Sequence, residues 1–312
     1  MVCGIRQTGK RNTELTFFQL CGVRPKRMPL KVNTYLRAAR LHRPIGIWLT
    51  LLPALWGIFL ASPGIPPLFL VLLFVCGATF MRSAGCIYND IIDKDFDAKV
   101  RRTASRPFAA GEISLKEAYL VLLFFLMCSA FILFSLPLPV ILTGFMALFL
   151  IFLYPWMKRL TYWPQFFLGI TFNMGLLMGW LSLNPRLSFV PLLFYGGAIL
   201  WTIGYDTIYA LQDKDDDLLA GVKSSAIAVS KAPKLFLSGV YSLSLILWGI
   251  GGKEAHLKGM YWLFLSLIAF HFTWQILTLR EDDPPNCLKR FQSNTTIGIL
   301  LLFGIVLSRL LY

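Results

Sequence analysis

The sequence predicts an all-α polytopic membrane protein with nine transmembrane helices and a cytoplasmic N-terminus. Of its 312 residues, 56% are hydrophobic and only 15% are charged, and the mean hydropathy is +0.64. A soluble domain of this size would carry about a quarter charged residues. The apolar residues form blocks long enough to cross a bilayer, about 17–25 residues each. Because the backbone finds no hydrogen-bond partners in lipid, such blocks must be helices.

The expected helices follow from the apolar blocks and from the turn residues between them. Arg43-Pro44 opens the first helix, since proline is tolerated in a first helical turn. The turns PGIPP, PLP and NPR separate later helices. The expected spans are 44–62, 68–88, 118–136, 140–154, 166–183, 189–205, 235–251, 260–279 and 295–312. Long loops are expected at 89–117 and 206–234.

Two domains are expected, a basic N-terminal tail at 1–34 and a single transmembrane domain at 35–312. Residues 1–30 hold six Lys or Arg against Glu14, and no apolar core of signal-peptide type precedes Leu30. Both a cytoplasmic tail and a short organelle-targeting segment have this composition. The bacterial inner (plasma) membrane is the expected location, with the mitochondrial inner membrane as the alternative.

The distribution of positive charge predicts the orientation. With the N-terminus inside, the cytoplasmic segments hold 25 of the 30 Lys and Arg residues. Membrane proteins concentrate basic residues on the cytoplasmic side, which also accounts for the net charge of +14 without nucleic acid as a partner. Both long loops therefore face the cytoplasm.

A first cluster of polar residues follows the second expected helix. Asn89, Asp93 and Asp97 stand at i, i+4 and i+8, which places them on one face of a helix, and Asp90 lies beside them. Carboxylates arranged in this way repel each other unless a cation lies between them.

A second cluster begins at Tyr205 and contains Asp206, Asp213 and Asp217 at i, i+7 and i+11. Together the two clusters hold nine of the sixteen acidic residues of a strongly basic chain. An acidic run is usually a solvated loop face. Here, however, both runs begin where apolar helices end, and ionisable groups at membrane depth are usually functional.

The clusters indicate a magnesium-diphosphate site that opens into an apolar bundle. Carboxylate and amide oxygens are ligands suited to Mg²⁺, which completes its shell with water and substrate phosphate. Nearby cations can hold the remaining phosphate charge, namely Arg101, Arg102, Arg106 and Lys158. A substrate with a diphosphate head and a long hydrocarbon tail fits both parts.

These motifs resemble those of the UbiA family of intramembrane prenyltransferases. The resemblance rests on NDxxDxxxD at Asn89–Asp97, RTASRP at 102–107, YPxxKR at Tyr154–Arg159 and YDTxYAxxDxxDD at Tyr205–Asp217. It extends to LHRPIG at 41–46, MRSAGCxxND at 81–90, YWPQ at 162–165 and GVKSSA at 221–226, and covers about residues 35–310. The motifs are most similar to the 4-hydroxybenzoate polyprenyltransferase branch, with SSA in place of the frequent STA.

The resemblance implies a helical bundle around a central cavity and a Mg²⁺-dependent enzyme of ubiquinone biosynthesis. Its substrates would be polyprenyl diphosphate and 4-hydroxybenzoate, joined at the ring carbon ortho to the hydroxyl with release of pyrophosphate. The implied metal ligands are Asn89, Asp93, Asp97, Asp206, Asp213 and Asp217. The implied catalytic set contains these five aspartates and Asp90.

Further residues are expected to bind the substrates. Arg43 is the candidate for the benzoate carboxylate, with a positive-inside anchor as the alternative. Tyr154 and Tyr209 are candidates to face the allylic cation, although packing is an alternative for Tyr154. Lys158 and Lys223 are expected at phosphate, with snorkelling anchors as the alternative. Asn89, Arg102 and Arg106 complete the substrate-binding prediction.

Other functions remain open at this point. Within the same family the acceptor could be homogentisate, a naphthoate or haem. An ion-coupled transporter would also carry intramembrane acids, although near the middle of its helices. A phosphatidyl-alcohol transferase also uses clustered aspartates and Mg²⁺. The sequence predicts no particular protein partner.

Overall fold

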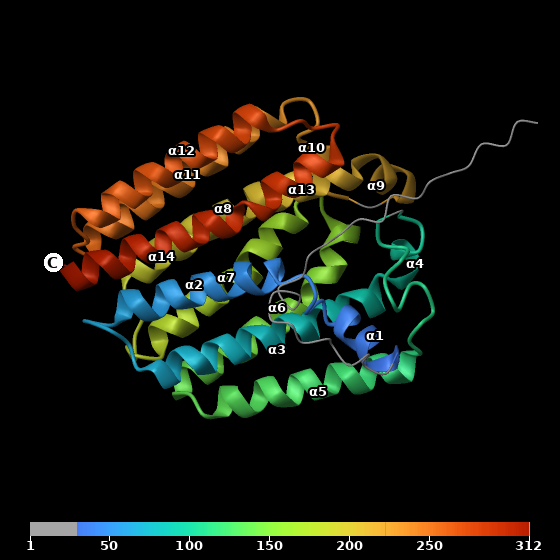
Figure 1. Ribbon diagram of the computed structural model, residues 1–312, viewed down its shortest axis with the longest axis horizontal. Helices are drawn as coiled ribbons and strands as arrows, with labels where there is room; N and C mark the ends of the chain where they lie inside the picture. Colours follow the sequence, from blue (N-terminus) through green and yellow to red (C-terminus); the bar gives the residue numbers. More distant parts are fainter. Residues whose placement is uncertain (1–29, 101, 222, 312) are drawn as a thin grey trace, which may run out of the picture.

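The structure is a computed structural model that describes residues 30–100, 102–221 and 223–311 (Figure 1). Most of the expected tail and Arg101 lie outside the described residues. The last residues assigned to the tail begin helix α1 (Leu30–Ala38). Every regular element within the described residues is helical, as the sequence predicts.

Long helices build the bundle and short ones lie at one end of it. The long helices are α2 (Ile45–Ala61), α3 (Leu68–Ile92), α5 (Leu115–Phe134), α6 (Leu138–Leu160), α7 (Pro164–Leu181), α8 (Phe189–Ala210), α11 (Pro233–Glu254), α12 (Met260–Thr278) and α14 (Asn294–Leu311). The short ones are α4 (Lys94–Asp97), η2 (Leu211–Asp213), α9 (Lys214–Ala220), α10 (Ser225–Ala228) and α13 (Pro284–Gln292).

The described chain contains six segments that are long and apolar enough to cross a membrane. They are α3, α5, α6, α11, α12 and the continuous stretch formed by α13 and α14. Helix α2 is apolar but shorter, with 17 residues. These lengths and compositions confirm an all-helical membrane protein.

Several helices continue beyond their expected ends, and α6 runs to Leu160 instead of residue 154. Helix α3 extends through Asn89 and Asp90 to Ile92, and α8 extends through Asp206 to Ala210. The expected loops at 89–117 and 206–234 therefore begin too early. Polar side chains at a helix end resemble a loop in the sequence, whereas here they face a cavity and the backbone stays helical.

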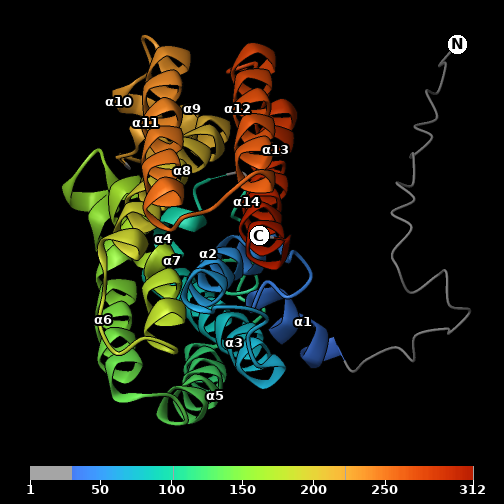
Figure 2. The same cartoon turned by 90° about the vertical axis from the view of Figure 1, so that its left-hand side faces the viewer.

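The long helices lie side by side, with α4 and α9 at the same end of the bundle (Figure 1). Viewed along the bundle, α5 lies at one edge, α11 and α12 lie at the opposite edge, and α6 runs along one side (Figure 2). The C-terminus lies at the end away from α4 (Figure 1).

Three buried tryptophans join helices from both halves of the chain. The ring centroid of Trp56 lies 5.4 Å from that of Trp201 and 5.7 Å from that of Trp248. Each indole N–H is satisfied, since Trp56 donates to the Gly298 carbonyl at 3.0 Å and Trp201 to Asn294 Oδ1 at 2.8 Å. Trp248 donates to a carbonyl of α8. This cluster fixes α2, α8, α11 and α14 relative to one another.

Glycines allow α2 and α7 to pack in close contact beside the cavity. A Cβ at Gly57 would lie 2.0 Å from the Leu176 carbonyl oxygen, and one at Gly179 would lie 2.3 Å from the Ala54 carbonyl oxygen. Both obstacles are backbone atoms, so they cannot be relieved by a rotamer change. Any side chain at Gly57 must therefore push the two helices apart.

We expect Gly57→Ala to lower the free energy of unfolding by about 1–3 kcal/mol, because one methyl group overpacks this crossing. Thermal unfolding of the purified protein in detergent measures the effect. Gly239→Ala in α11 is the matched control, since a Cβ there meets nothing within 4 Å. Equal midpoints for the two variants would contradict the close packing of α2 and α7.

Candidate active site at the mouth of a central cavity

A cavity of about 760 Å³ runs from the α4 end of the bundle into its interior. Its mouth is lined by charged side chains of both acidic clusters. Its inner part is apolar, and we call it the apolar arm; its lining includes Phe74, Leu126, Ile132, Leu133, Phe145, Leu148 and Ile151. The cavity thus pairs a charged end with a hydrocarbon-like end.

The first carboxylate set lies where α3 ends and α4 begins. Asp93 caps the end of α3 and accepts hydrogen bonds from Asn89 Nδ2 at 3.1 Å and from Lys158 Nζ at 3.0 Å. Asp97 accepts from Arg106 Nη1 at 2.5 Å. Asp93 and Asp97 are both buried. Asn89 and Asp93 are therefore in direct contact, whereas Asp97 is held by Arg106 in the lining of the same cavity.

Asp90 shares Arg106 with Asp97 and has a second cationic partner of its own. It is buried and binds Arg106 Nη1 at 3.1 Å and Arg40 Nη2 at 2.5 Å. Arg40 lies two residues after the end of α1, in the left-handed region with φ of 56°. Glycine is the usual residue at such a helix end, because other L-residues are strained there by about 1–2 kcal/mol. The ion pair with Asp90 accounts for an arginine at this position.

The second carboxylate set lies on three consecutive elements. Asp206 is in α8, Asp213 ends η2, and Asp217 is in α9. The guanidinium of Arg102 binds both oxygens of Asp213, with Nε at 3.0 Å and 2.8 Å. Arg102 also donates to the Tyr209 hydroxyl at 2.7 Å and lies over its ring. Arg102 thereby joins the first loop to the second carboxylate set.

Burial shifts the protonation of the charged groups at the mouth. Desolvation, reinforced by the Asp213 carboxylate, raises the pKa of Asp217 to about 7. Desolvation also raises the pKa of Asp97, against the opposing effect of Arg106. Burial alone would lower the pKa of Arg102, but Tyr209 and Asp213 outweigh it and raise that pKa. The mouth therefore disfavours uncompensated carboxylate charge and favours a bound cation.

The donor atoms of the two sets fit Mg²⁺. All six predicted ligands line the one cavity and offer oxygen donors: Asn89, Asp93, Asp97, Asp206, Asp213 and Asp217. Among the described side chains, no three acids converge into a metal cage made of protein alone. That arrangement suits Mg²⁺, which usually takes one or two carboxylates together with water and substrate phosphate. In this structure three of these carboxylates form salt bridges with basic side chains: Asp93 with Lys158, Asp97 with Arg106, and Asp213 with Arg102.

Arg82 is a cation that the residue predictions above did not include. It belongs to α3, lines the cavity and lies over the ring of Phe172 at 5.1 Å. Its Nη1 donates to Cys86 Sγ at 2.7 Å, while its Nε is buried without a hydrogen-bond partner. In the described part of the chain it makes no salt bridge. A lone arginine within an apolar helix was the sequence signal for this site.

The remaining predicted residues also line the cavity. The Lys158 Nζ lies over the Tyr154 ring, 6.0 Å from its centroid, and both residues line the cavity. Lys223 Nζ donates to the Leu160 carbonyl at 3.4 Å and lies over Tyr162. Arg43 is exposed at the rim. No contact of Arg43 distinguishes its two predicted roles, carboxylate binding and membrane anchoring.

The sequence matches the profile of the UbiA prenyltransferase family over residues 50–312. The chain belongs to this family. Among its UbiA relatives, the mitochondrial 4-hydroxybenzoate polyprenyltransferase of Bos taurus is 43% identical, over 90% of this chain and 77% of the relative. The 4-hydroxybenzoate octaprenyltransferase of Chromohalobacter salexigens is 39% identical, over 89% of this chain and 93% of the relative.

Solved UbiA homologues share the fold. The apo homologue from Aeropyrum pernix K1 superposes with a TM-score of 0.73 at 24% identity, covering 83% of this chain and 97% of that one. The Archaeoglobus fulgidus homologue bound to GPP and Mg²⁺ gives 0.67 at 20% identity, covering 88% and 99%. The helical arrangement described above is therefore the UbiA fold.

We expect Arg102→Gln to separate metal binding from diphosphate binding. The substitution frees Asp213 from its cation, so binding of Mn²⁺ alone should be retained or strengthened. Affinity for a prenyl diphosphate should fall about tenfold, because a charge-assisted contact is lost. Calorimetric titrations measure both affinities, and Lys31→Gln, which removes a surface pair with Glu117, is the control. Parallel loss of both affinities would contradict this role of Arg102.

Proposed function

We propose that the chain transfers a polyprenyl group from polyprenyl diphosphate to the ring carbon ortho to the hydroxyl of 4-hydroxybenzoate. Pyrophosphate is released, and the product serves ubiquinone biosynthesis. The observation that carries this proposal is the single cavity with two carboxylate sets at its mouth and an apolar arm behind them. Membership of the UbiA family and the names of the relatives support the same reaction.

The mouth binds the diphosphate end of the donor. Asn89, Asp93 and Asp97 on one side and Asp206, Asp213 and Asp217 on the other would hold Mg²⁺. Bound Mg²⁺ supplies charge neutralisation and activates pyrophosphate as a leaving group. Arg102, Arg106, Lys158 and Lys223 hold the remaining phosphate charge as it grows on the departing group. Asp90 positions Arg40 and Arg106 through its two ion pairs.

The apolar arm accommodates the prenyl chain. Its walls offer hydrocarbon and aromatic surface without charge, so the first isoprene units leave water when they bind. Exclusion of water also protects the allylic cation from quenching. Tyr154 and Tyr209 face the mouth side of this space, where an aromatic ring stabilises a neighbouring positive charge.

Two arginines, Arg43 and Arg82, are candidates to bind the carboxylate of the aromatic acceptor. Arg43 lies at the exposed rim, whereas Arg82 lies inside the cavity with an unsatisfied Nε. A buried N–H without an acceptor is costly, and a benzoate carboxylate would satisfy the Arg82 Nε by paired hydrogen bonds to the guanidinium. We therefore assign the carboxylate to Arg82. Arg43 then guides the acceptor at the entrance or anchors the helix end.

Nine transmembrane helices with a cytoplasmic N-terminus complete the proposed topology. The bias of Lys and Arg toward the end that carries α4 and α9 supports this orientation. Reporter fusions after Lys158 and Arg186 test it, since the two should report opposite sides. The proposed location is the bacterial inner membrane, with the mitochondrial inner membrane as the alternative, and fractionation of the tagged full chain distinguishes them.

The rival functions differ in what they require of the cavity. An ion-coupled transporter needs acids along its path, whereas these acids lie at one end and are paired with phosphate-type cations. Homogentisate, naphthoate and haem acceptors fit the same diphosphate mouth. Incubation of membranes with polyprenyl diphosphate, Mg²⁺ and a panel of aromatic acids, followed by product analysis, tests the proposed acceptor against them.

Asp93→Ala or Asp213→Ala should reduce prenyl transfer about a hundred- to a thousand-fold, the usual effect of removing one electrostatic element of a catalytic site. The rate of formation of prenylated 4-hydroxybenzoate in membranes measures the loss. Asp282→Ala is the matched control, because the Asp282 side chain is 97% exposed. Near-normal rates in either cluster variant, with normal membrane insertion, would contradict the assignment of that residue.

Arg82→Ala should raise the KM for 4-hydroxybenzoate about tenfold or more, because a charged hydrogen-bonding partner is lost. The KM for the prenyl donor should change little. Arg309→Ala serves as control, since Arg309 is also an arginine of a membrane helix with a buried Nε but lies away from the cavity lining. If Arg43→Ala raised the acceptor KM and Arg82→Ala did not, the carboxylate would belong to Arg43.

A further inference from the structure

Outside the cavity, α13 places an arginine against the surface of α12. The guanidinium carbon of Arg290 lies 3.9 Å from the ring centroid of Trp274. Its Nε is buried and has no hydrogen-bond partner. Across the described residues, no carboxylate lies within salt-bridge distance of Arg290. Stacking fixes this cation in place while leaving its charge uncompensated.

Polar side chains beside Arg290 form a rigid support. His271 Nε2 lies 3.2 Å from Ser293 Oγ, and the His271 ring packs against Trp274 with centroids 5.1 Å apart. The buried Gln275 donates to Ser293 Oγ at 2.9 Å and accepts from the Tyr241 hydroxyl at 3.2 Å. Ser293 Oγ in turn donates to the Arg290 carbonyl at 2.8 Å. A second basic side chain, His271, thus stands next to the unpaired guanidinium.

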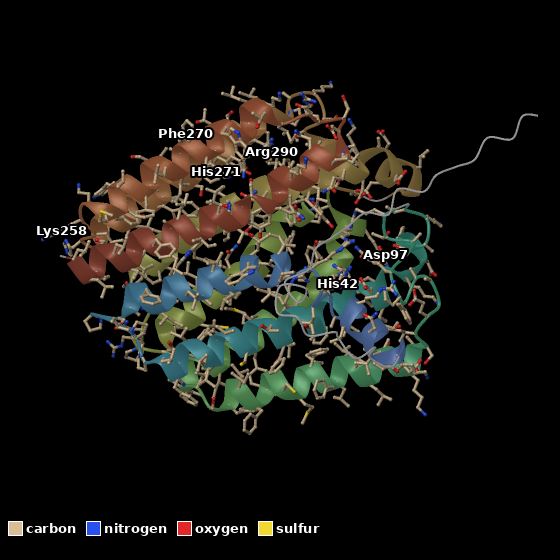
Figure 3. All side chains as sticks on the ribbon, in the orientation of Figure 1. His42, Asp97, Lys258, Phe270, His271 and Arg290 are labelled. Carbon is tan, nitrogen blue, oxygen red and sulfur yellow. The ribbon has the colours of Figure 1, made fainter. Side chains whose placement is uncertain are left out.

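This cluster lies nearer to the end of α12 that is followed by α13 than to the start of α12. Helix α12 carries Trp262 near its start and Trp274 twelve residues later, about 18 Å along the axis. Tryptophan is enriched at membrane interfaces, so Trp274 marks a candidate headgroup level on this side of the bundle. Figure 3 shows His271, Phe270 and Arg290 along α12 and α13, apart from His42 and Asp97 at the cavity mouth.

An apolar strip continues from Trp274 toward the other end of α12. Phe270 and Leu263 are 73% and 52% exposed, and together with Leu267 they share the face of Trp274 at helical spacing. In a membrane these side chains contact acyl chains. The Arg290 cation therefore lies beside a surface suited to a lipid tail.

We propose that α12 and α13 bind one anionic phospholipid, with its headgroup phosphate at Arg290 and His271 and an acyl chain along the Phe270 strip. Basic pockets between membrane helices on the cytoplasmic side are suited to such headgroups. A zwitterionic lipid brings its own cation beside the phosphate, whereas an anionic lipid supplies the charge that Arg290 lacks. The site is separate from the substrate cavity and does not depend on the proposed reaction.

The test uses the purified full chain in an uncharged detergent. Phosphatidylglycerol, phosphatidylcholine or inorganic phosphate is added, thermal unfolding gives the apparent affinity, and native mass spectrometry counts bound lipids. Phosphatidylglycerol should raise the unfolding midpoint and bind as one retained molecule. Phosphatidylcholine should bind at least about tenfold more weakly, the effect expected from losing one charge-assisted contact. Equal effects of the two lipids, or of phosphate alone, would overturn the proposal.

Variants locate the site. Arg290→Gln should weaken phosphatidylglycerol binding about tenfold, because the cation is lost while the backbone contacts of residue 290 remain. Trp274→Leu should weaken it as well, since the guanidinium loses its stacking surface. Arg280→Gln removes an exposed charge just beyond the same end of α12 and should change binding less than twofold. Equal losses for Arg280→Gln and Arg290→Gln would show general charge attraction and overturn the assignment.

Discussion

The pairing of carboxylates with arginine and lysine at the end of apolar helices is the interaction on which this structure depends. Asp90, Asp93 and Asp97 are buried, and an unpaired carboxylate there would carry a large desolvation penalty. Their partners come from other segments, Arg40 from the end of α1 and Lys158 from α6. The same pairs that make burial tolerable therefore draw the loops and helix ends together into one mouth.

The mouth can keep its geometry because the helices beneath it cannot shift freely. Trp56, Trp201 and Trp248 hold helices from both halves of the chain in contact, and each ring nitrogen has an acceptor. Close glycine contacts between α2 and α7 add packing that no larger residue allows. In lipid, where the hydrophobic effect does not drive helices together, such packing and hydrogen bonding supply the association. The packed helices thus support the mouth, and the charged residues at the helix ends form the candidate binding site.

The sequence predicted the membrane class, the approximate helices and the residues of both acidic clusters, because these depend on local composition and spacing. It placed the ends of α3 and α8 too early, since Asp90 and Asp206 resemble loop residues unless the cavity they face is known. The ion pair of Arg40 with Asp90 spans 50 positions in the chain, and nothing in the basic N-terminal segment distinguishes Arg40 from its neighbours. Arg82 was visible as a charge inside an apolar run. That its Nε lacks a hydrogen-bond partner depends on how distant segments pack around it, which the sequence does not show.

The ion pairs at the mouth also bear on how a charged substrate is accepted. A diphosphate brought in with Mg²⁺ adds anionic and cationic charge together, so the total charge of the mouth changes little. Asp93 and Asp213 would hold the metal, and Lys158 and Arg102, which pair with these carboxylates in this structure, would then be available to phosphate oxygens. Such an exchange would leave each cation with an anionic neighbour, which matters because an uncompensated buried charge is costly. The pairs that make burial tolerable in this structure would thus, by exchange of partners, supply the groups that neutralise the leaving pyrophosphate in the proposed reaction.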